Sequence, residues 1–265
     1  MRTLLMLLAA ALLSGCAALG LEEGDSGDGV RVAAAFYPLA YVAERVAGQP
    51  VDLLTTPGAE PHDFELTVQE TALVARADLV VFERGFQPAV DAAVETTAEG
   101  KPLDAAEAVD LLDAGEHAHE GHDHEGQDPH FWHDPLRMAD LGDAVADALA
   151  EVDPQGADEY VANAADLRRD LEEIDRAYDE ELASCARDTV VVSHDAFAYL
   201  EKYGLHLEPI AGLSPDAEPT PAHLAQLQEL ARDEGITTVF AETLGSRQLA
   251  DTLAGDLGLH TRELD

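Results

Sequence analysis

The chain has 265 residues, of which 54 are acidic and only 15 are lysine or arginine, giving a formal net charge of −39. This balance argues against nucleic-acid binding, because no basic surface is available to follow a phosphate backbone. It also argues against broad docking on anionic lipid, whereas it attracts cations weakly. The length suffices for one large domain or two small lobes.

The N-terminus is typical of an exported lipoprotein. A basic residue is followed by a short apolar run and then by Leu-Ser-Gly-Cys, which ends at Cys16 and looks like a bacterial lipobox. The run is shorter than the 20 or so residues that a membrane-spanning helix needs. We expect residues 1–15 to be a signal peptide and Cys16 to carry the lipid anchor, with an ordinary secretory signal as the alternative. The small, acidic residues 16–29 are predicted to form a flexible tether.

Short apolar runs alternate with helical patterns over residues 30–153. The strand candidates are Val30–Phe36, Val51–Thr55 and Asp78–Phe82, and the helix candidates are Tyr41–Ala47, Thr67–Ala77, Pro88–Thr96 and Pro135–Glu151. Such alternation predicts βαβ units around a parallel sheet. We therefore expect an N-terminal α/β lobe.

An acidic, histidine-rich stretch at residues 113–128 interrupts this pattern. It holds His117, His119, His122 and His124 among carboxylates. Imidazole is a common ligand for zinc and other borderline metals, and a tract without apolar periodicity builds no core. We interpret the stretch as an auxiliary metal-capture loop, and a solvated linker is the alternative.

A long helix is predicted over residues 154–184. Its apolar residues recur at spacings of three and four from Tyr160 to Leu182, which places them on one stripe. Roughly 30 residues span about 45 Å, more than a crossover helix needs. We expect a rigid strut between two lobes, with a dimer or coiled-coil helix as the alternative.

Residues 185–265 return to the strand-helix alternation. The strand candidates are Thr189–Ser193, Thr237–Ala241 and the terminal HTRELD, and the helix candidates are Ala196–Tyr203, Pro221–Glu234 and Ser246–Leu257. The predicted fold is therefore α/β, with two Rossmann-like lobes joined by one long rigid helix and a cleft between them.

Four candidate metal ligands lie in loops, mostly at the carboxyl ends of strands, where open α/β sheets bind ligands. They are His62, His130, His194 and Asp265. Three imidazoles and a carboxylate suit tetrahedral zinc. Their positions are scattered through the sequence, so a hydrogen-bonded loop residue is the alternative at each position.

Several neighbouring side chains are predicted to support this site. We expect Asp63 and Glu65 to orient His62 through its second ring nitrogen, and Trp132 to be a packing anchor. His133 is expected either to lie behind a ligand or to be exposed. The other remaining histidines, His206, His223 and His260, are expected at the surface. If Cys16 is lipidated, Cys185 is the one cysteine left.

Five segments together resemble the zinc-binding lipoproteins of bacterial ABC importers, the ZnuA-like and AdcA-like members of the cluster A-I solute-binding proteins. The segments are GAEPHDFE around His62, DPHFWHDP around His130, SHDAFAYLEKYGL around His194, GLSPDAEPTP at 212–221 and FAETLGSRQLADTLAGDLG at 240–258. The likeness extends from about residue 30 to the end of the chain.

The resemblance implies that His62, His130 and His194 bind Zn²⁺ in the interlobe cleft. Many members add an aspartate from an LDP-like segment, of which Leu264-Asp265 matches the first two residues. Members usually continue for several tens of residues more, so we expect the chain to be truncated. Glu60 or water is then the alternative to Asp265 as fourth ligand.

The resemblance also implies an extracytoplasmic, monomeric, non-enzymatic protein that delivers zinc to an ABC permease and its ATPase. Three imidazoles favour zinc, whereas more carboxylates would favour manganese. The alternatives are a manganese-binding homologue, a cell-surface zinc hydrolase and a metal buffer or adhesin. No HExxH or GxSxG motif supports the hydrolase.

Overall fold

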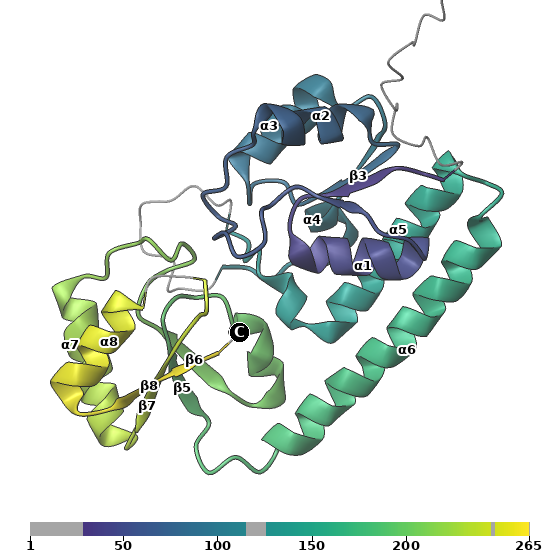
Figure 1. The fold of residues 1–265 in the computed structure, drawn as a ribbon. Helices are drawn as coiled ribbons and strands as arrows, with labels where there is room; N and C mark the ends of the chain where they lie inside the picture. Colours follow the sequence, from purple (N-terminus) through teal and green to yellow (C-terminus); the bar gives the residue numbers. More distant parts are fainter. Residues whose placement is uncertain (1–28, 115–125, 245–246, 265) are drawn as a thin grey trace, which may run out of the picture.

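A computed structural model describes residues 29–114, 126–244 and 247–264 (Figure 1). The predicted signal peptide, Cys16, the four loop histidines between residues 117 and 124, and Asp265 all lie outside the described residues. Within the described residues, no helix combines the length and the apolarity that a bilayer crossing requires.

The N-terminal lobe is built on a parallel four-stranded sheet with the strand order β2-β1-β3-β4. Its strands are β1 (Val32–Ala34), β2 (Asp52–Leu53), β3 (Leu79–Phe82) and β4 (Lys101–Asp104). The two central strands, β1 and β3, are wholly buried, as expected for a parallel sheet covered on both faces.

Five helices belong to this lobe. They are α1 (Tyr37–Ala47), α2 (Val68–Arg76), α3 (Pro88–Thr97), the short α4 (Ala105–Ala108) and α5 (Pro135–Val152). In Figure 1, α2 and α3 lie on one side of the sheet and α1 and α5 on the other. The sheet and helices share one apolar core.

Local sequence sets where two helices of this lobe begin. Thr67 and Glu70 form a capping box at the start of α2, each side chain accepting the backbone N–H of the other. Asp134 caps α5 by accepting the backbone N–H of Leu136 at 3.0 Å, and Pro135 occupies the first helical position. The start of α5, directly after the turn that carries His130, is therefore fixed by its own local sequence.

The long helix α6 (Ala157–Leu182) has 26 residues and runs from the N-terminal lobe to the C-terminal lobe, a length of roughly 39 Å. Its first half is core, because Leu167 is fully buried and packs against Gly142 of α5. Its second half departs from the predicted apolar stripe, since Ile174 and Tyr178 are 45% and 42% exposed.

The C-terminal lobe repeats the strand order of the first, as β6-β5-β7-β8, again all parallel. Its strands are β5 (Thr189–Val192), β6 (His206–Pro209), β7 (Thr238–Ala241) and β8 (His260–Glu263), and its α-helices are α7 (Pro221–Asp233) and α8 (Gln248–Leu257). The predicted fold of two α/β lobes joined by a long helix is confirmed.

Several elements differ from the sequence prediction, among them the short helix α4, which was not predicted. The segment expected as an α-helix near residue 200 is a 3₁₀ helix, η2 (Ala198–Tyr203). The strands β4 and β6 were not predicted, because each is a short strand at the edge of its sheet. Three of the four residues in each strand are polar or proline, so neither gives the apolar run of a buried strand.

We expect Leu167→Ala to lower the free energy of unfolding by roughly 2–5 kcal/mol, because it opens a cavity between α5 and α6. Ile174→Ala, on the half-exposed part of the same helix, is the matched control and should cost less than about 1 kcal/mol. Urea unfolding followed by the fluorescence of Trp132, the one tryptophan of the chain, measures both. Equal losses in the two variants would contradict this packing.

Candidate metal centre

Three of the predicted ligands come together between the lobes. His62 lies in the loop that follows β2, His130 precedes the 3₁₀ helix η1 (Phe131–His133), and His194 follows β5. One ring nitrogen from each lies within 4.8 Å of the others, and the Nε2 atoms of His62 and His130 are 3.1 Å apart. The N-terminal lobe supplies two of the imidazoles and the C-terminal lobe supplies the third.

Each imidazole is held from behind by a carboxylate on its Nδ1 atom. The pairs are His62 with Glu60 at 2.5 Å, His130 with Asp128 at 2.7 Å and His194 with Glu242 at 2.6 Å. A carboxylate accepts a hydrogen bond, so Nδ1 carries the proton and the lone pair of Nε2 points into the cleft. Such carboxylates orient metal-binding histidines and make them better ligands.

Converging lone pairs repel one another unless a cation lies between them. The Nε2 atom of His194 is buried and makes no hydrogen bond within the described residues. Zn–N bonds of 2.0–2.1 Å in a tetrahedron separate two nitrogens by about 3.3 Å, close to the observed 3.1 Å between His62 and His130. The arrangement therefore suits a small, imidazole-binding cation.

The carboxylates behind the imidazoles differ in electrostatics. Burial raises the pKa of Asp128 to about 7, and the hydrogen bond from the backbone of His130 and the charge of His194 offset only part of this effect. Burial acts in the same direction on Glu60 and Glu242, but their hydrogen-bonded histidines outweigh it and lower both pKa values. Glu60 and Glu242 are therefore anionic at neutral pH.

The residue that orients His62 is Glu60 rather than the predicted Asp63 or Glu65. One carboxylate oxygen of Glu60 contacts Nδ1 of His62, and the other accepts the backbone N–H of His62 at 2.9 Å. Asp63 instead pairs with Asp216, and this contact raises the pKa of Asp63. Glu65 is exposed.

The two N-terminal-lobe ligands share a local motif that sequence reasoning missed. Glu60-Pro61-His62 and Asp128-Pro129-His130 have an acid two residues before the ligand. In both, the carboxylate accepts the backbone N–H of the histidine at 2.9 Å and also contacts its Nδ1. This acid-Pro-His signal is visible in the sequence. The sequence gives a weaker indication for Glu242, which only lies directly after the strand β7, at the edge where ligand-binding residues gather.

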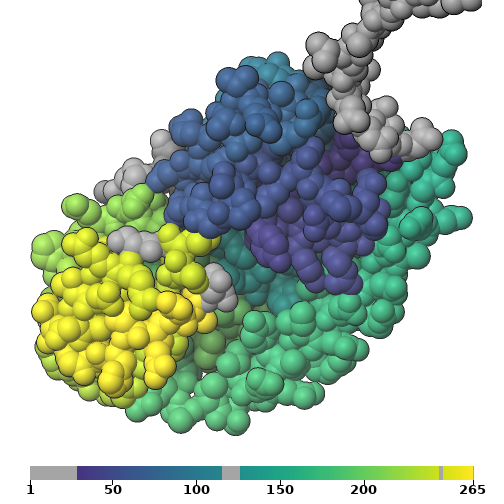
Figure 2. Space-filling model, in the orientation of Figure 1, coloured from purple at the N-terminus to yellow at the C-terminus, as the bar shows by residue number. Residues whose placement is uncertain are grey.

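The imidazoles border a cavity of about 760 Å³. Its other walls are largely apolar and include Phe36, Trp132, Phe197 and Leu244. On the face of the molecule drawn in Figure 2, the N-terminal lobe (purple and blue) meets the C-terminal lobe (green and yellow). Apolar walls lower the local dielectric and strengthen charge interactions at the imidazoles.

The other histidines of the described residues do not belong to the group of three converging imidazoles. The ring of His133 packs 4.6 Å from the ring of Phe197, and burial lowers the pKa of His133 to about 3. Trp132 packs edge-on against Phe36 and Phe86, as the predicted packing anchor. His206 and His260 are exposed, whereas His223 is half-buried with Nε2 2.8 Å from the carbonyl oxygen of Pro209.

We expect Glu242→Gln to weaken metal binding about tenfold, because a neutral amide holds the Nδ1 proton of His194 less strongly than a carboxylate does. Glu229→Gln, on the exposed face of α7, is the matched control and should bind as the unmodified chain does. Zinc titration in competition with a chelator measures both variants. Equal affinity of the two variants would contradict a role for Glu242 in orienting His194.

A family model described as "ZnuA: Zinc-uptake complex component A periplasmic" matches residues 32–265. The high-affinity zinc uptake system protein ZnuA of Bacillus subtilis is 30% identical over 253 residues, covering 91% of this chain and 79% of that protein. The zinc-binding lipoprotein AdcA of Streptococcus pneumoniae R6 is 34% identical over 249 residues. The match covers 89% of this chain but only 50% of AdcA, so the chain spans about half the length of that relative.

Among solved structures, the laminin-binding protein Lmb of Streptococcus agalactiae has the same fold. The TM-score is 0.79 at 26% identity, and the match covers 89% of each chain. Lmb is described as a bifunctional protein with adhesin and metal transporting activity. The family model covers nearly all of the described residues, and the resemblance seen in the sequence is confirmed: the chain belongs to the ZnuA family of zinc-uptake complex components.

Proposed function

We propose that this chain is the zinc-capturing component of an ABC importer. In this proposal, Zn²⁺ is the cargo and binds through the Nε2 atoms of His62, His130 and His194. The observation that supports it most is the convergence of three inward-facing imidazoles on one point between the lobes. Membership of a family of zinc-uptake components supports the same cargo.

Zinc is favoured over manganese by the chemistry of the ligands. Three neutral nitrogen ligands suit Zn²⁺, whereas Mn²⁺ prefers oxygen. The nearest carboxylates, Glu60, Asp128 and Glu242, face the Nδ1 atoms behind the rings rather than the point where the Nε2 atoms meet. The negative charge of Glu60 and Glu242 stabilises a bound dication without making the site oxygen-rich.

Further parts of the proposal concern residues outside the described ranges. We propose Asp265 as the fourth ligand, with water as its alternative. His117, His119, His122 and His124 would capture zinc weakly and pass it to the cleft. Cys16 would hold the protein at the outer side of the cell membrane by its lipid, beside the permease and ATPase that receive the metal.

The other functions raised by the sequence are less well supported. Proteins of the ZnuA family are transport components rather than enzymes, which removes the hydrolase alternative. Adhesion has support from the description of Lmb. Zinc uptake or metal transport, in contrast, is named for the family model, for ZnuA of Bacillus subtilis and for Lmb, and AdcA is described as zinc-binding.

The first test is a zinc and manganese titration of the soluble form that starts after Cys16, in competition with a chelator of known affinity. We expect one tight zinc site and much weaker manganese binding. The site should survive deletion of residues 115–126 and be lost in His194→Ala. His206→Ala, which removes an exposed histidine, is the control. Tight binding that disappears with the loop deletion alone would place the site in the loop and overturn the proposal for the cleft.

Zinc affinity should fall as the pH falls, because a protonated imidazole cannot bind metal and the ordinary histidine pKa is about 6.5. Asp128, whose pKa is about 7, acts in the same direction, since a protonated carboxyl accepts the Nδ1 proton of His130 less strongly. We expect a loss of at least about tenfold between pH 7.5 and about 5.5. Calorimetry in two buffers should show proton release on binding at the lower pH, and a flat profile would contradict imidazole ligation.

A further inference from the structure

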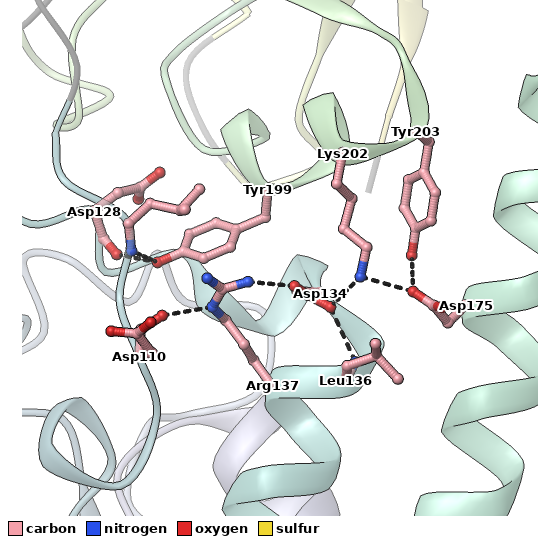
Figure 3. Close-up of polar contacts among 10 residues, drawn as sticks. Asp110, Asp128, Asp134, Leu136, Arg137, Asp175, Tyr199, Lys202 and Tyr203 are labelled. Atoms are coloured by element: carbon pink, nitrogen blue, oxygen red, sulfur yellow. Dashed lines mark hydrogen bonds and ion pairs between the residues drawn. The ribbon is translucent and has the colours of Figure 1, made fainter.

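One tyrosine of the C-terminal lobe reaches into the N-terminal lobe and contacts the backbone of Asp128 (Figure 3). Tyr199, in η2, is only 1% exposed and belongs to the N-terminal core cluster. Its hydroxyl donates to the carbonyl oxygen of Asp128 at 2.6 Å and accepts the backbone N–H of Leu112 at 3.0 Å. Tyr199 thus uses both hydrogen-bonding capacities of its hydroxyl across the boundary between the lobes.

The two groups that the hydroxyl contacts are neighbours across the chain. The backbone N–H of Asp128 donates to the carbonyl oxygen of Leu112 at 2.8 Å, and Asp113 pairs with Gln127 in an antiparallel bridge. Residues 112–113 and 127–128 therefore pair with each other at the two ends of the histidine-rich stretch. The hydroxyl of Tyr199 makes a hydrogen bond to each of these two paired segments.

Asp128 also connects these paired segments to a ligand histidine. Its Oδ1 atom accepts from the backbone N–H of His130 at 2.9 Å and lies 2.7 Å from Nδ1 of the same residue. These two contacts couple the position of Asp128 to the position of the His130 imidazole. Tyr199 is separated from that imidazole by one residue, Asp128.

Tyr199 is also close in sequence to the ligand from the other lobe, His194. The intervening segment is folded by short-range hydrogen bonds, from the N–H of Ala196 to the carbonyl of His194 and from the N–H of Leu200 to the carbonyl of Phe197, both 2.9 Å. The residues from His194 to Tyr199 and from Asp128 to His130 therefore form one continuous path, joined by the hydrogen bond between Tyr199 and Asp128, that begins and ends at a ligand histidine. A metal ion bound by both histidines would close it.

Surrounding contacts fix the ring and the helix that carries it. The guanidinium of Arg137 lies 4.9 Å from the ring centre of Tyr199 and also pairs with Asp134. Lys202, on the same 3₁₀ helix, bridges Asp134 and Asp175 at 2.7 Å each. Figure 3 shows these contacts tying η2 to α5 and α6.

We infer that Tyr199 is a positioning residue for metal binding, whose hydroxyl sets the spacing between His130 of one lobe and His194 of the other. The inference rests on the proposed function, because it assumes that one ion binds both imidazoles. Metal sites need ligand geometry held within about 0.5 Å. The path through Tyr199 and Asp128 contains few residues and two hydrogen bonds, and it constrains the two ligands close to the metal. The helix α6 also connects the lobes, but it is too far from the ligands to set their spacing.

The test compares Tyr199→Phe with Tyr203→Phe. Both remove one hydroxyl from the same 3₁₀ helix, and the hydroxyl of Tyr203 donates to Asp175 at 2.7 Å, away from the ligands. We expect Tyr199→Phe to weaken zinc binding by about tenfold or more, and Tyr203→Phe to leave it unchanged. Melting temperatures of the metal-free proteins should fall to a similar extent, which separates positioning from stability.

A spectroscopic measurement supplies a readout that general destabilisation does not change. Co²⁺ bound in place of zinc gives visible absorption bands that depend on coordination geometry. We expect these bands to shift or weaken in Tyr199→Phe at saturating Co²⁺, and to stay as in the unmodified protein in Tyr203→Phe. Circular dichroism confirms that each variant is folded.

The outcomes separate the two proposals. If the unmodified protein binds zinc tightly and Tyr199→Phe binds it equally well, the inference about Tyr199 is wrong but the proposed function stands. The same conclusion follows if both variants lose affinity to the same extent. An unmodified protein with no tight zinc site would overturn the proposed function, and the inference with it.

Discussion

The structure depends on holding three imidazole nitrogens face to face with their lone pairs pointing at one another. This arrangement is unfavourable in the absence of a cation, so it exists only because the surrounding fold imposes it. Each ring is fixed by a carboxylate on Nδ1, and two of the three rings are almost fully buried, with His130 at 0% and His194 at 5% exposed. The free energy that the fold spends in this way is recovered when a metal binds, a form of preorganisation.

The parts of the fold follow from this requirement. Parallel sheets bring loops to their carboxyl edges, and two such sheets on opposite sides of a cleft bring loops from distant parts of the chain to one point. In the first lobe, the acid-Pro-His segments of His62 and His130 combine two constraints. The proline fixes its own φ angle, and the carboxylate of the acid accepts the backbone N–H of the histidine two residues later. In the second lobe, Glu242 contacts both Ser193 and His194 and so ties the end of β7 to the end of β5.

The sequence alone was sufficient to predict the two lobes, the long helix and the three histidines. The central strands are continuous apolar runs, and each histidine lies in a motif that resembles one family. The sequence was not sufficient where structure depends on contacts between distant residues. Nothing near Glu242 indicates that it meets His194, 48 positions away, and the proline of Lys101–Asp104 obscures β4. The second half of α6 has the periodicity of a buried helix, but Ile174 and Tyr178 stay partly exposed because this half contacts the short helix η2 at a few side chains.

The unequal sharing of ligands between the lobes has a consequence for release of the ion. His62 and His130 belong to the same lobe and lie 3.1 Å apart at their Nε2 atoms, so under the proposed function the two would act as a bidentate half-site. If the contact with His194 is broken first, the chelate effect keeps the ion on the N-terminal lobe in an under-coordinated state. An incoming ligand from an acceptor protein can then replace one imidazole at a time by associative exchange. The ion would thereby pass from one set of ligands to the next without first leaving the protein as a free hydrated dication.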